Sequence, residues 1–194
     1  RLFGGPVSLN LAQTGSQTVN AGNLTLRLAT AIRSSDEPAE ALGIEDVYSS
    51  SYGDSLIGNS RNNIIYIGAK VANATDTITG AAGEDMLDFT ARSSGITIDL
   101  SKTGTAQTIA GTYGMNLTSL DMEDVTGTFF ADTITGNSLK NVLLSLDGND
   151  KVTGSSGDDV IFGGLGDDTI SGSEGNDVLV GGEAYSDMIW PAPD

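Results

Sequence analysis

The sequence predicts an all-β fold in which short parallel strands stack as a β-roll or β-solenoid, and three observations lead to this prediction. Residues 154–180 form three consecutive nine-residue units, GSSGDDVIF, GGLGDDTIS and GSEGNDVLV. The same phase of nine continues backwards to residue 118, with an aliphatic residue kept at the eighth place. A stretch of the N-terminal half also aligns with this region. Repeats of fixed period predict small units that stack along one axis.

The first elements expected along the chain are two strands, one upstream of each half. Residues 6–15, PVSLNLAQTG, match residues 95–104, GITIDLSKTG. In the second segment apolar and polar residues alternate from Ile96 to Leu100, which predicts a half-buried strand. A polar, proline-containing stretch near residues 27–42 is either a longer surface loop or a short helix, and its composition favours neither.

The degenerate part of the repeat occurs twice. Residues 43–65 align without a gap to residues 121–143, and the identical pairs are Glu45/Glu123, Val47/Val125, Asp54/Asp132, Gly58/Gly136 and Asn63/Asn141. After four extra residues at 67–70, the first copy continues as VANATDTIT and GAAGEDMLD. The shared positions predict a tandem duplication.

This duplication divides the chain into two predicted domains. Residues 1–88 form a first degenerate solenoid copy that includes the stretch near 27–42. Residues 89–194 form a second copy, which runs into regular repeats at 145–182 and ends in a C-terminal cap. A last coil exposes its apolar column, and Met188, Ile189 and Trp190 are the expected covering residues.

Each regular unit combines a glycine-rich turn with a very short strand. In GGLGDDTIS, the glycines at 163, 164 and 166 allow positive φ and close backbone approach, so a tight turn can point several carbonyl oxygens at one spot. Asp168 adds a carboxylate, and hard oxygen ligands of both kinds are what Ca²⁺ prefers. Thr169, Ile170 and Ser171 alternate in polarity, which suits a short strand with one inward side chain. Each unit therefore predicts a calcium-binding turn followed by a strand.

The template G-[GS]-x-G-x-D-x-[IL]-x resembles the RTX (hemolysin-type) calcium-binding nonapeptide repeats of secreted bacterial proteins. The resemblance implies a right-handed parallel β-roll with calcium bound in the turns. The predicted metal-binding residues of the regular repeats are Asp150, Gly154, Gly157, Asp159, Gly163, Gly164, Gly166, Asp168, Gly172, Gly175, Asp177, Gly181 and Gly182. Those of the degenerate units are Asp54, Asp76, Asp85 and Asp132.

The alternative is that the acidic turns are ordinary solvated loops. Against it, aspartate, glycine and the inward aliphatic residue all recur in phase, and carboxylates stacked about 4.8 Å apart would repel without a counter-ion. Alternate units fall on the same edge of a stack of coils. We therefore expect Asp150 to pair with Asp168 and Asp159 with Asp177, and the turns at Asn63 and Asn141 to bind calcium weakly or not at all.

The amino-acid composition argues against several classes of partner and of catalytic chemistry. Nine basic residues against 26 acidic ones leave a net charge of −17, which argues against nucleic acid and anionic membranes as partners. Cysteine and histidine are absent, so disulfides, cysteine nucleophiles, a histidine base and the usual zinc ligands are excluded. No segment approaches the ~18 consecutive apolar residues of a membrane helix. The chain is expected to be a processed form or a fragment, because Arg1 is not an initiator methionine.

The motifs of common enzymes are also missing. The sequence contains no G-x-S-x-G, H-E-x-x-H or phosphate-binding glycine-rich motif, and paired carboxylates such as Asp158 and Asp159 recur instead of forming one constellation. We therefore expect a non-enzymatic, extracellular structural module that folds on calcium binding after export. Self-association and a cell-surface polysaccharide are its possible partners. The alternative is the accessory calcium-binding domain of a secreted protease, lipase or epimerase whose catalytic domain lies outside this chain.

Overall fold

The computed structural model describes residues 8–10, 15–18, 25–28 and 46–182, and within these ranges it contains strands and turns but no helix. The described part of the chain is thus all-β, as predicted. The strands are β1 Ser8–Asn10, β2 Gly15–Thr18, β3 Thr25–Leu28, β4 Asp46–Tyr48, β5 Ser55–Ile57, β6 Ile64–Tyr66, β7 Thr75–Thr79, β8 Met86–Asp88, β9 Thr97–Asp99, β10 Gln107–Ala110, β11 Tyr113–Leu117, β12 Asp124–Thr126, β13 Thr133–Thr135, β14 Val142–Leu144, β15 Lys151–Ser156, β16 Val160–Phe162, β17 Thr169–Glu174 and β18 Val178–Val180.

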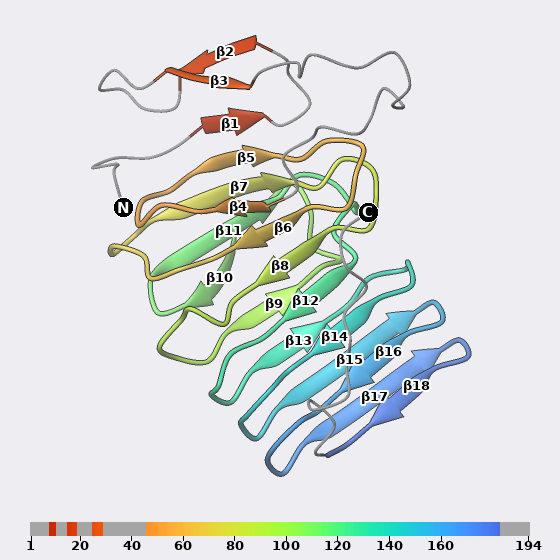
Figure 1. Ribbon diagram of the computed structural model, residues 1–194. Helices are drawn as coiled ribbons and strands as arrows, with labels where there is room; N and C mark the ends of the chain where they lie inside the picture. The colour runs from red at the N-terminus through yellow and green to blue at the C-terminus, as the bar shows by residue number, and fades with distance from the viewer. Residues whose placement is uncertain (1–7, 11–14, 19–24, 29–45, 183–194) are drawn as a thin grey trace.

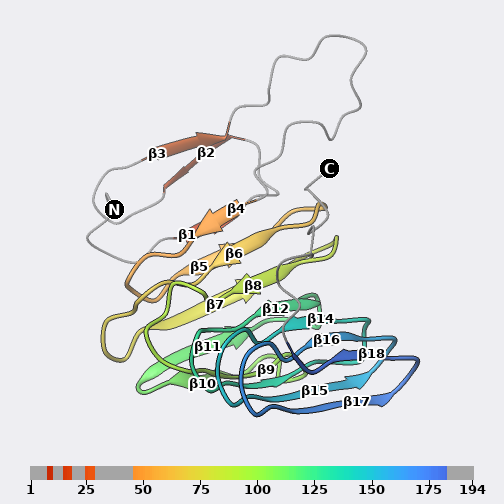
Figure 2. The ribbon, with the colours of Figure 1, turned by 60° about the horizontal axis from the view of Figure 1, so that its bottom comes forward.

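Two layers of strands, parallel except for β10, run along the stack (Figure 1). One layer is a seven-stranded sheet in the order β18-β16-β14-β12-β8-β6-β4. The other layer consists of a four-stranded sheet, β17-β15-β13-β9, and a five-stranded sheet, β1-β5-β7-β11-β10. From β12 to β18 the chain alternates between the layers, and in Figure 2 the strands β14, β16 and β18 lie above β15 and β17.

The register of this pairing equals two nine-residue units. Ile134 lies opposite Val152, and Val152 lies opposite Ile170, so each coil contains 18 residues. In the first half the repeat distance is longer by the four extra residues, since Leu56 pairs with Ile78. The insertion at 67–70 is taken up in the connection between β6 and β7.

Both strands predicted upstream of the copies form at equivalent places. Strand β1 pairs with β5, and β9 pairs with β13, each in parallel register. Between β9 and β12 the chain makes a hairpin that sequence reasoning did not predict, because β10 pairs antiparallel with β11. Strand β11 then pairs with β7. This hairpin separates the two sheets of the second layer, whereas β8 pairs directly with β12 and keeps the seven-stranded sheet continuous.

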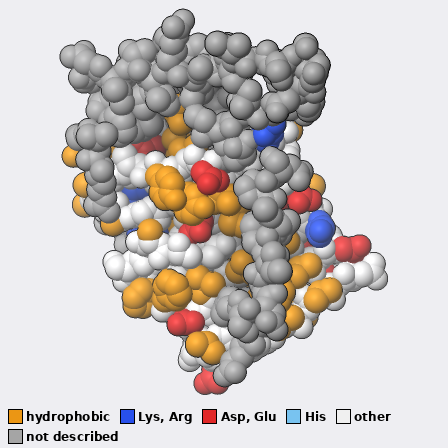
Figure 3. Space-filling model, viewed as in Figure 1, with side chains coloured by type: hydrophobic (Ala, Val, Ile, Leu, Met, Phe, Trp, Pro, Cys, Tyr) orange, Lys and Arg blue, Asp and Glu red, His pale blue; other side chains and the backbone are white. Residues whose placement is uncertain are grey.

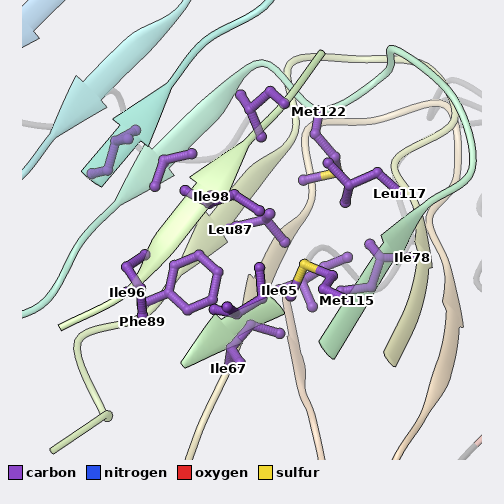
Figure 4. Packing of buried hydrophobic residues seen from close by; sticks show 14 of the residues in the cluster. Ile65, Ile67, Ile78, Leu87, Phe89, Ile96, Ile98, Met115, Leu117 and Met122 are labelled. Carbon is purple, nitrogen blue, oxygen red and sulfur yellow. The ribbon is translucent and has the colours of Figure 1, made fainter. Parts of the chain in front are cut away.

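The core is a single column of apolar side chains between the two layers. The eighth place of each unit supplies much of it, and Figure 4 shows Ile65, Ile78, Leu87 and Ile98 pointing toward one another. Fully burying one such side chain contributes about 1.5–3 kcal/mol. At the C-terminal end the column is more open, since Leu179 is 48% exposed. The predicted cap at 188–190, and most of the predicted loop near 27–42, lie outside the described residues.

On the face shown in Figure 3, acidic side chains are spread along the stack with hydrophobic side chains between them. Among the described residues, no helix is long and apolar enough to cross a membrane.

Candidate metal centres

The turns of the regular repeats lie on two edges of the stack. We number the nine positions of a unit as places 1 to 9, so that the conserved aspartate of GGLGDDTIS is place 6. The turns that lead into β13, β15 and β17 form the first edge, and those that lead into β14, β16 and β18 form the second edge. Because the strands pair in register, equivalent turn residues of successive coils are stacked above one another.

A ladder of hydrogen bonds connects the place 6 side chains along each edge. On the first edge, Asp132 donates its backbone N–H to Oδ1 of Asp150 (2.7 Å), and Asp150 donates to Oδ1 of Asp168 (2.9 Å). On the second edge, Asn141 donates to Asp159 (2.8 Å), and Asp159 donates to Asp177 (3.0 Å). The predicted pairing of these aspartates across coils is confirmed as a contact, while an ion shared between them stays a prediction.

The turns differ in whether the second carboxylate oxygen of the place 6 aspartate has a hydrogen-bond partner. Oδ2 of Asp85, Asp150, Asp159 and Asp168 is buried and has no hydrogen-bond partner. A buried polar atom without a partner costs free energy, so such an oxygen calls for a ligand. Burial raises the pKa of Asp85 to about 7 and that of Asp150 to about 6. These carboxylates are therefore costly to keep ionised unless a cation lies beside them.

Backbone conformation marks the same turns. In the turns of Asp85, Asp150, Asp159, Asp168 and Asp177, both place 2 and place 4 have positive φ, and we call these the open turns. Place 2 is then a residue that is often not glycine, such as Leu146 (φ 78°) or Ser155 (φ 89°). A left-handed conformation costs a non-glycine residue about 1–2 kcal/mol. Strain of this kind is found at functional sites. Place 2 and place 4 of the open turns are Ala81 and Gly83, Leu146 and Gly148, Ser155 and Gly157, Gly164 and Gly166, and Ser173 and Gly175.

The glycines serve two different needs. At place 4 a side chain would meet the coil before, because a Cβ on Gly166 or Gly175 would overlap the carbonyl of Gly148 or Gly157. At place 1 a side chain would displace the carboxylate, since a Cβ on Gly163 would lie 2.5 Å from Oδ2 of Asp168. The same holds for Gly154 with Asp159 and Gly172 with Asp177. For Gly181 and Gly182, also predicted at the site, a Cβ would meet nothing within 4 Å.

In four of the degenerate units, those of Asp54, Asn63, Asp132 and Asn141, the place 6 side chain accepts a hydrogen bond from the place 2 N–H of its own turn. Thr128 donates its N–H to Oδ2 of Asp132 (2.7 Å), and Asn137 donates to Oδ1 of Asn141 (2.9 Å). The place 2 N–H groups of Ser50 and Asn59 do the same for Asp54 and Asn63. We call these the closed turns, and in none of them does place 2 or place 4 have positive φ.

The last of the predicted residues, Asp76, lies beside Asp54 on one edge of the first copy. Lys70 Nζ is 3.2 Å from Oδ2 of Asp54 and 2.8 Å from Oδ2 of Asp76. Burial raises the pKa of Asp76, and the Lys70 ammonium opposes that shift. The predicted site residues are thus divided among open turns, closed turns and one ion-paired coil.

Sequence reasoning included the place 4 glycines Gly157, Gly166 and Gly175 among the site residues, but it missed Gly83, Gly148 and the residues other than glycine at place 2 of the open turns. The signal was glycine at place 4, which is present at Gly83 and Gly148 and is replaced by Tyr52, Arg61, Phe130 and Leu139 in the closed turns. Nowhere in the described part of the chain do three or more aspartate, glutamate, histidine or cysteine side chains form a metal cluster. An ion in an open turn would therefore need backbone carbonyl oxygens as ligands beside the carboxylates.

The donor set of the open turns thus fits a hard cation. A comparison with protein families gives the same result for the C-terminal region: the family model described as RTX calcium-binding nonapeptide repeat (4 copies) matches residues 126–161, 135–170 and 144–179. No curated protein sequence matches the chain. The three matched ranges are shifted by nine residues, the length of one unit, and repeats of this family bind Ca²⁺. Residues 126–179 are therefore a segment of RTX calcium-binding nonapeptide repeats.

Proposed function

We propose that the chain is a calcium-dependent structural module of a secreted or cell-surface bacterial protein, such as an adhesin, surface-layer or filament component. It folds as a right-handed parallel β-roll of two tandem copies, with calcium in the turns, after export from the cytosol. The observation that supports this most is the set of buried carboxylate oxygens without partners in the open turns. Bound calcium supplies the positive charge and coordination that these oxygens lack.

The proposed ligands come from the five open turns and from the carbonyl oxygens around them. The carboxylates are those of Asp85, Asp150, Asp159, Asp168 and Asp177. The Asp85 turn lies outside the matched repeats, so the first copy contributes a site as well. Since Asp150 and Asp168 follow each other on one edge, and Asp159 and Asp177 on the other, each filled site orders the turn of the next coil. Binding and folding are then cooperative along the stack.

A structural role accounts for the arrangement better than catalysis. The carboxylates repeat in equivalent surroundings, whereas a catalytic acid and base need distinct ones. The continuous seven-stranded sheet joins both copies into one stack, as a stiff extracellular module requires. Such a module acts through its surfaces and ends, and self-association or binding of a cell-surface polysaccharide is the use we propose for it.

Circular dichroism during a calcium titration, with magnesium as the control ion, tests the proposal. We expect β-structure to increase with calcium at about 0.1–1 mM, the range of extracellular calcium modules. Magnesium should have little effect, because it demands a smaller octahedral site. A spectrum already rich in β-structure in excess chelator and unchanged by calcium would contradict calcium-dependent folding.

A pair of variants in one turn gives the matched comparison. Asp168→Ala removes the inner carboxylate, and Asp167→Ala removes an adjacent, exposed carboxylate of the same charge. The calcium midpoint should rise severalfold for Asp168→Ala, and further when Asp177→Ala is added, but stay near that of the wild type for Asp167→Ala. Equal midpoints for the two single variants would mean that general negative charge, and no particular site, determines the response.

A further inference from the structure

One buried cation already lies among the turns of the first copy. The side chain of Lys70 is 1% exposed, and its Nζ contacts four oxygens. They are the carbonyls of Ser50 (2.8 Å) and Tyr52 (3.2 Å) and the carboxylates of Asp54 (3.2 Å) and Asp76 (2.8 Å). Ser50 and Tyr52 stand at places 2 and 4 of the Asp54 turn. The ammonium is thus enclosed by turn carbonyls and by place 6 carboxylates of two successive coils.

The equivalent coil of the second copy shows what this cation replaces. Asp76 and Asp150 occupy the same place of their copies, and each accepts through Oδ1 the backbone N–H of the place 6 residue one coil earlier (2.8 and 2.7 Å). The second carboxylate oxygens of the two residues differ in their hydrogen-bond partners. Oδ2 of Asp76 meets Lys70 Nζ and the Tyr113 hydroxyl (2.7 Å), whereas Oδ2 of Asp150 has no hydrogen-bond partner.

Lys70 is part of the four-residue insertion at 67–70, and several contacts hold this insertion in position. Ile67 is fully buried and donates its N–H to the carbonyl of Asp88 (2.7 Å). Arg92 donates through Nη1 to the carbonyl of Gly68 (3.1 Å). The Tyr113 ring lies 5.6 Å from Lys70 Nζ, at a distance suited to a cation–π contact. The second copy has no counterpart of residues 67–70, and therefore no such lysine.

We propose that the Lys70 ammonium is a built-in replacement for calcium, so that the coil of β5 and β7 forms without the ion and supports the calcium-dependent coils that stack beyond it. This inference rests on the proposed calcium sites of the second copy for its comparison. A tethered ammonium donates three hydrogen bonds to oxygen acceptors and needs no free ion. It supplies one positive charge to two carboxylates, and the Tyr113 hydroxyl donates a further hydrogen bond to Asp76.

Amide hydrogen exchange on the full chain in excess chelator is the direct test. For the wild type we expect β5 and β7 to stay protected while β15 and β17 exchange rapidly. In Lys70→Ala, exchange at β5 and β7 should become about a hundredfold faster in chelator, since one partner of a buried ion pair is lost. Protection should return in calcium, with one more calcium bound per chain by native mass spectrometry.

Lys102→Ala is the matched control, because Lys102 forms an exposed ion pair with Asp99 (3.3 Å) and its loss changes the net charge equally. It should behave like the wild type in chelator and in calcium. The proposal is overturned if Lys70→Ala keeps wild-type protection in chelator, or if calcium fails to restore the protection it loses. It is equally overturned if β5 and β7 of the wild type exchange as fast as β15 and β17.

A second pair of variants covers the case in which Lys70→Ala does not fold. In the wild-type background, Asp76→Asn should leave the number of bound calcium ions unchanged, whereas Asp159→Asn should lower it. A lower number for Asp76→Asn would show that calcium, and not Lys70, occupies this coil. If the wild type binds no calcium at all, the proposed function fails. The comparison of hydrogen exchange at β5 and β7 between the wild type and Lys70→Ala in chelator would still show whether Lys70 stabilises this coil.

Discussion

At the scale of single residues, the molecule depends on where the backbone can adopt positive φ. Gly166 has a φ of 136°, and a Cβ there would overlap the carbonyl of Gly148 in the coil before. Glycine at place 4 is thus needed twice, once for the conformation and once for the distance between coils. Where a larger residue stands at this place, as Phe130 does, the turn is closed and its place 6 side chain accepts a local N–H.

Gly166→Ala should therefore destabilise the calcium-bound chain by about 2 kcal/mol or more, from the left-handed conformation and the steric overlap together. Urea unfolding in saturating calcium measures this. Gly181→Ala is the control, because a Cβ there would meet nothing within 4 Å, and its change should stay within about 0.5 kcal/mol. A Gly166→Ala chain as stable as the wild type would contradict the assigned role of place 4.

At the scale of elements, most of the three-residue strands contribute one inward side chain to the column between the layers, and the longer strand β11 contributes three, Tyr113, Met115 and Leu117. The strands are only a few residues long, so no strand is stable by itself, and pairing with both neighbours is what holds it. Leu143 on β14 is fully buried, with Val125 and Ile161 on either side in the sheet. Leu179, at the same place of its unit on the terminal strand β18, is 48% exposed.

Leu143→Ala should accordingly cost about 2–5 kcal/mol of unfolding free energy, from lost burial and the cavity left in the column. Leu179→Ala makes the same chemical change at the same place and should cost less than half as much. Thermal and urea unfolding of both variants in saturating calcium provides the comparison. Similar losses would mean that the end of the stack is covered as completely as its middle.

At the scale of the whole molecule, charge opposes the compact state. The net charge is −17, and the inner carboxylates of the open turns lie in register along two edges. Mutual repulsion of this kind favours an expanded chain. Salt screens charges on the surface, but it cannot provide a ligand for a buried oxygen such as Oδ2 of Asp159.

Small-angle X-ray scattering should therefore separate specific binding from screening. We expect the radius of gyration to rise when calcium is removed by a chelator, and to stay high when sodium chloride is added to about 0.15 M. Calcium should restore the compact value. Recovery with sodium chloride alone would show that screening, with no occupied site, is sufficient for folding.

The sequence by itself determined the period, the short strands, the coil of 18 residues and the pairing of Asp150 with Asp168 and of Asp159 with Asp177. These properties follow from a local pattern that is repeated in phase, so each nine-residue unit specifies the same turn and strand as its neighbours. The hairpin of β10 and β11 carries no such repeat, and contacts with other parts of the chain place it, among them the pairing of β11 with β7, which is far away in the sequence.

Glycine at place 4 marks the open turns in the sequence, but the tertiary structure decided how each place 6 carboxylate is satisfied and which coil contains a cation. Asp132 and Asp150 both stand at place 6, yet Asp132 accepts an N–H from Thr128 through Oδ2, and Oδ2 of Asp150 has no hydrogen-bond partner. Asp76 differs again, because Lys70 reaches it from the inserted segment. The reason is physical: the surroundings of each carboxylate depend on the backbone conformation of its turn and on groups from neighbouring coils, and a nine-residue pattern does not specify which groups those are.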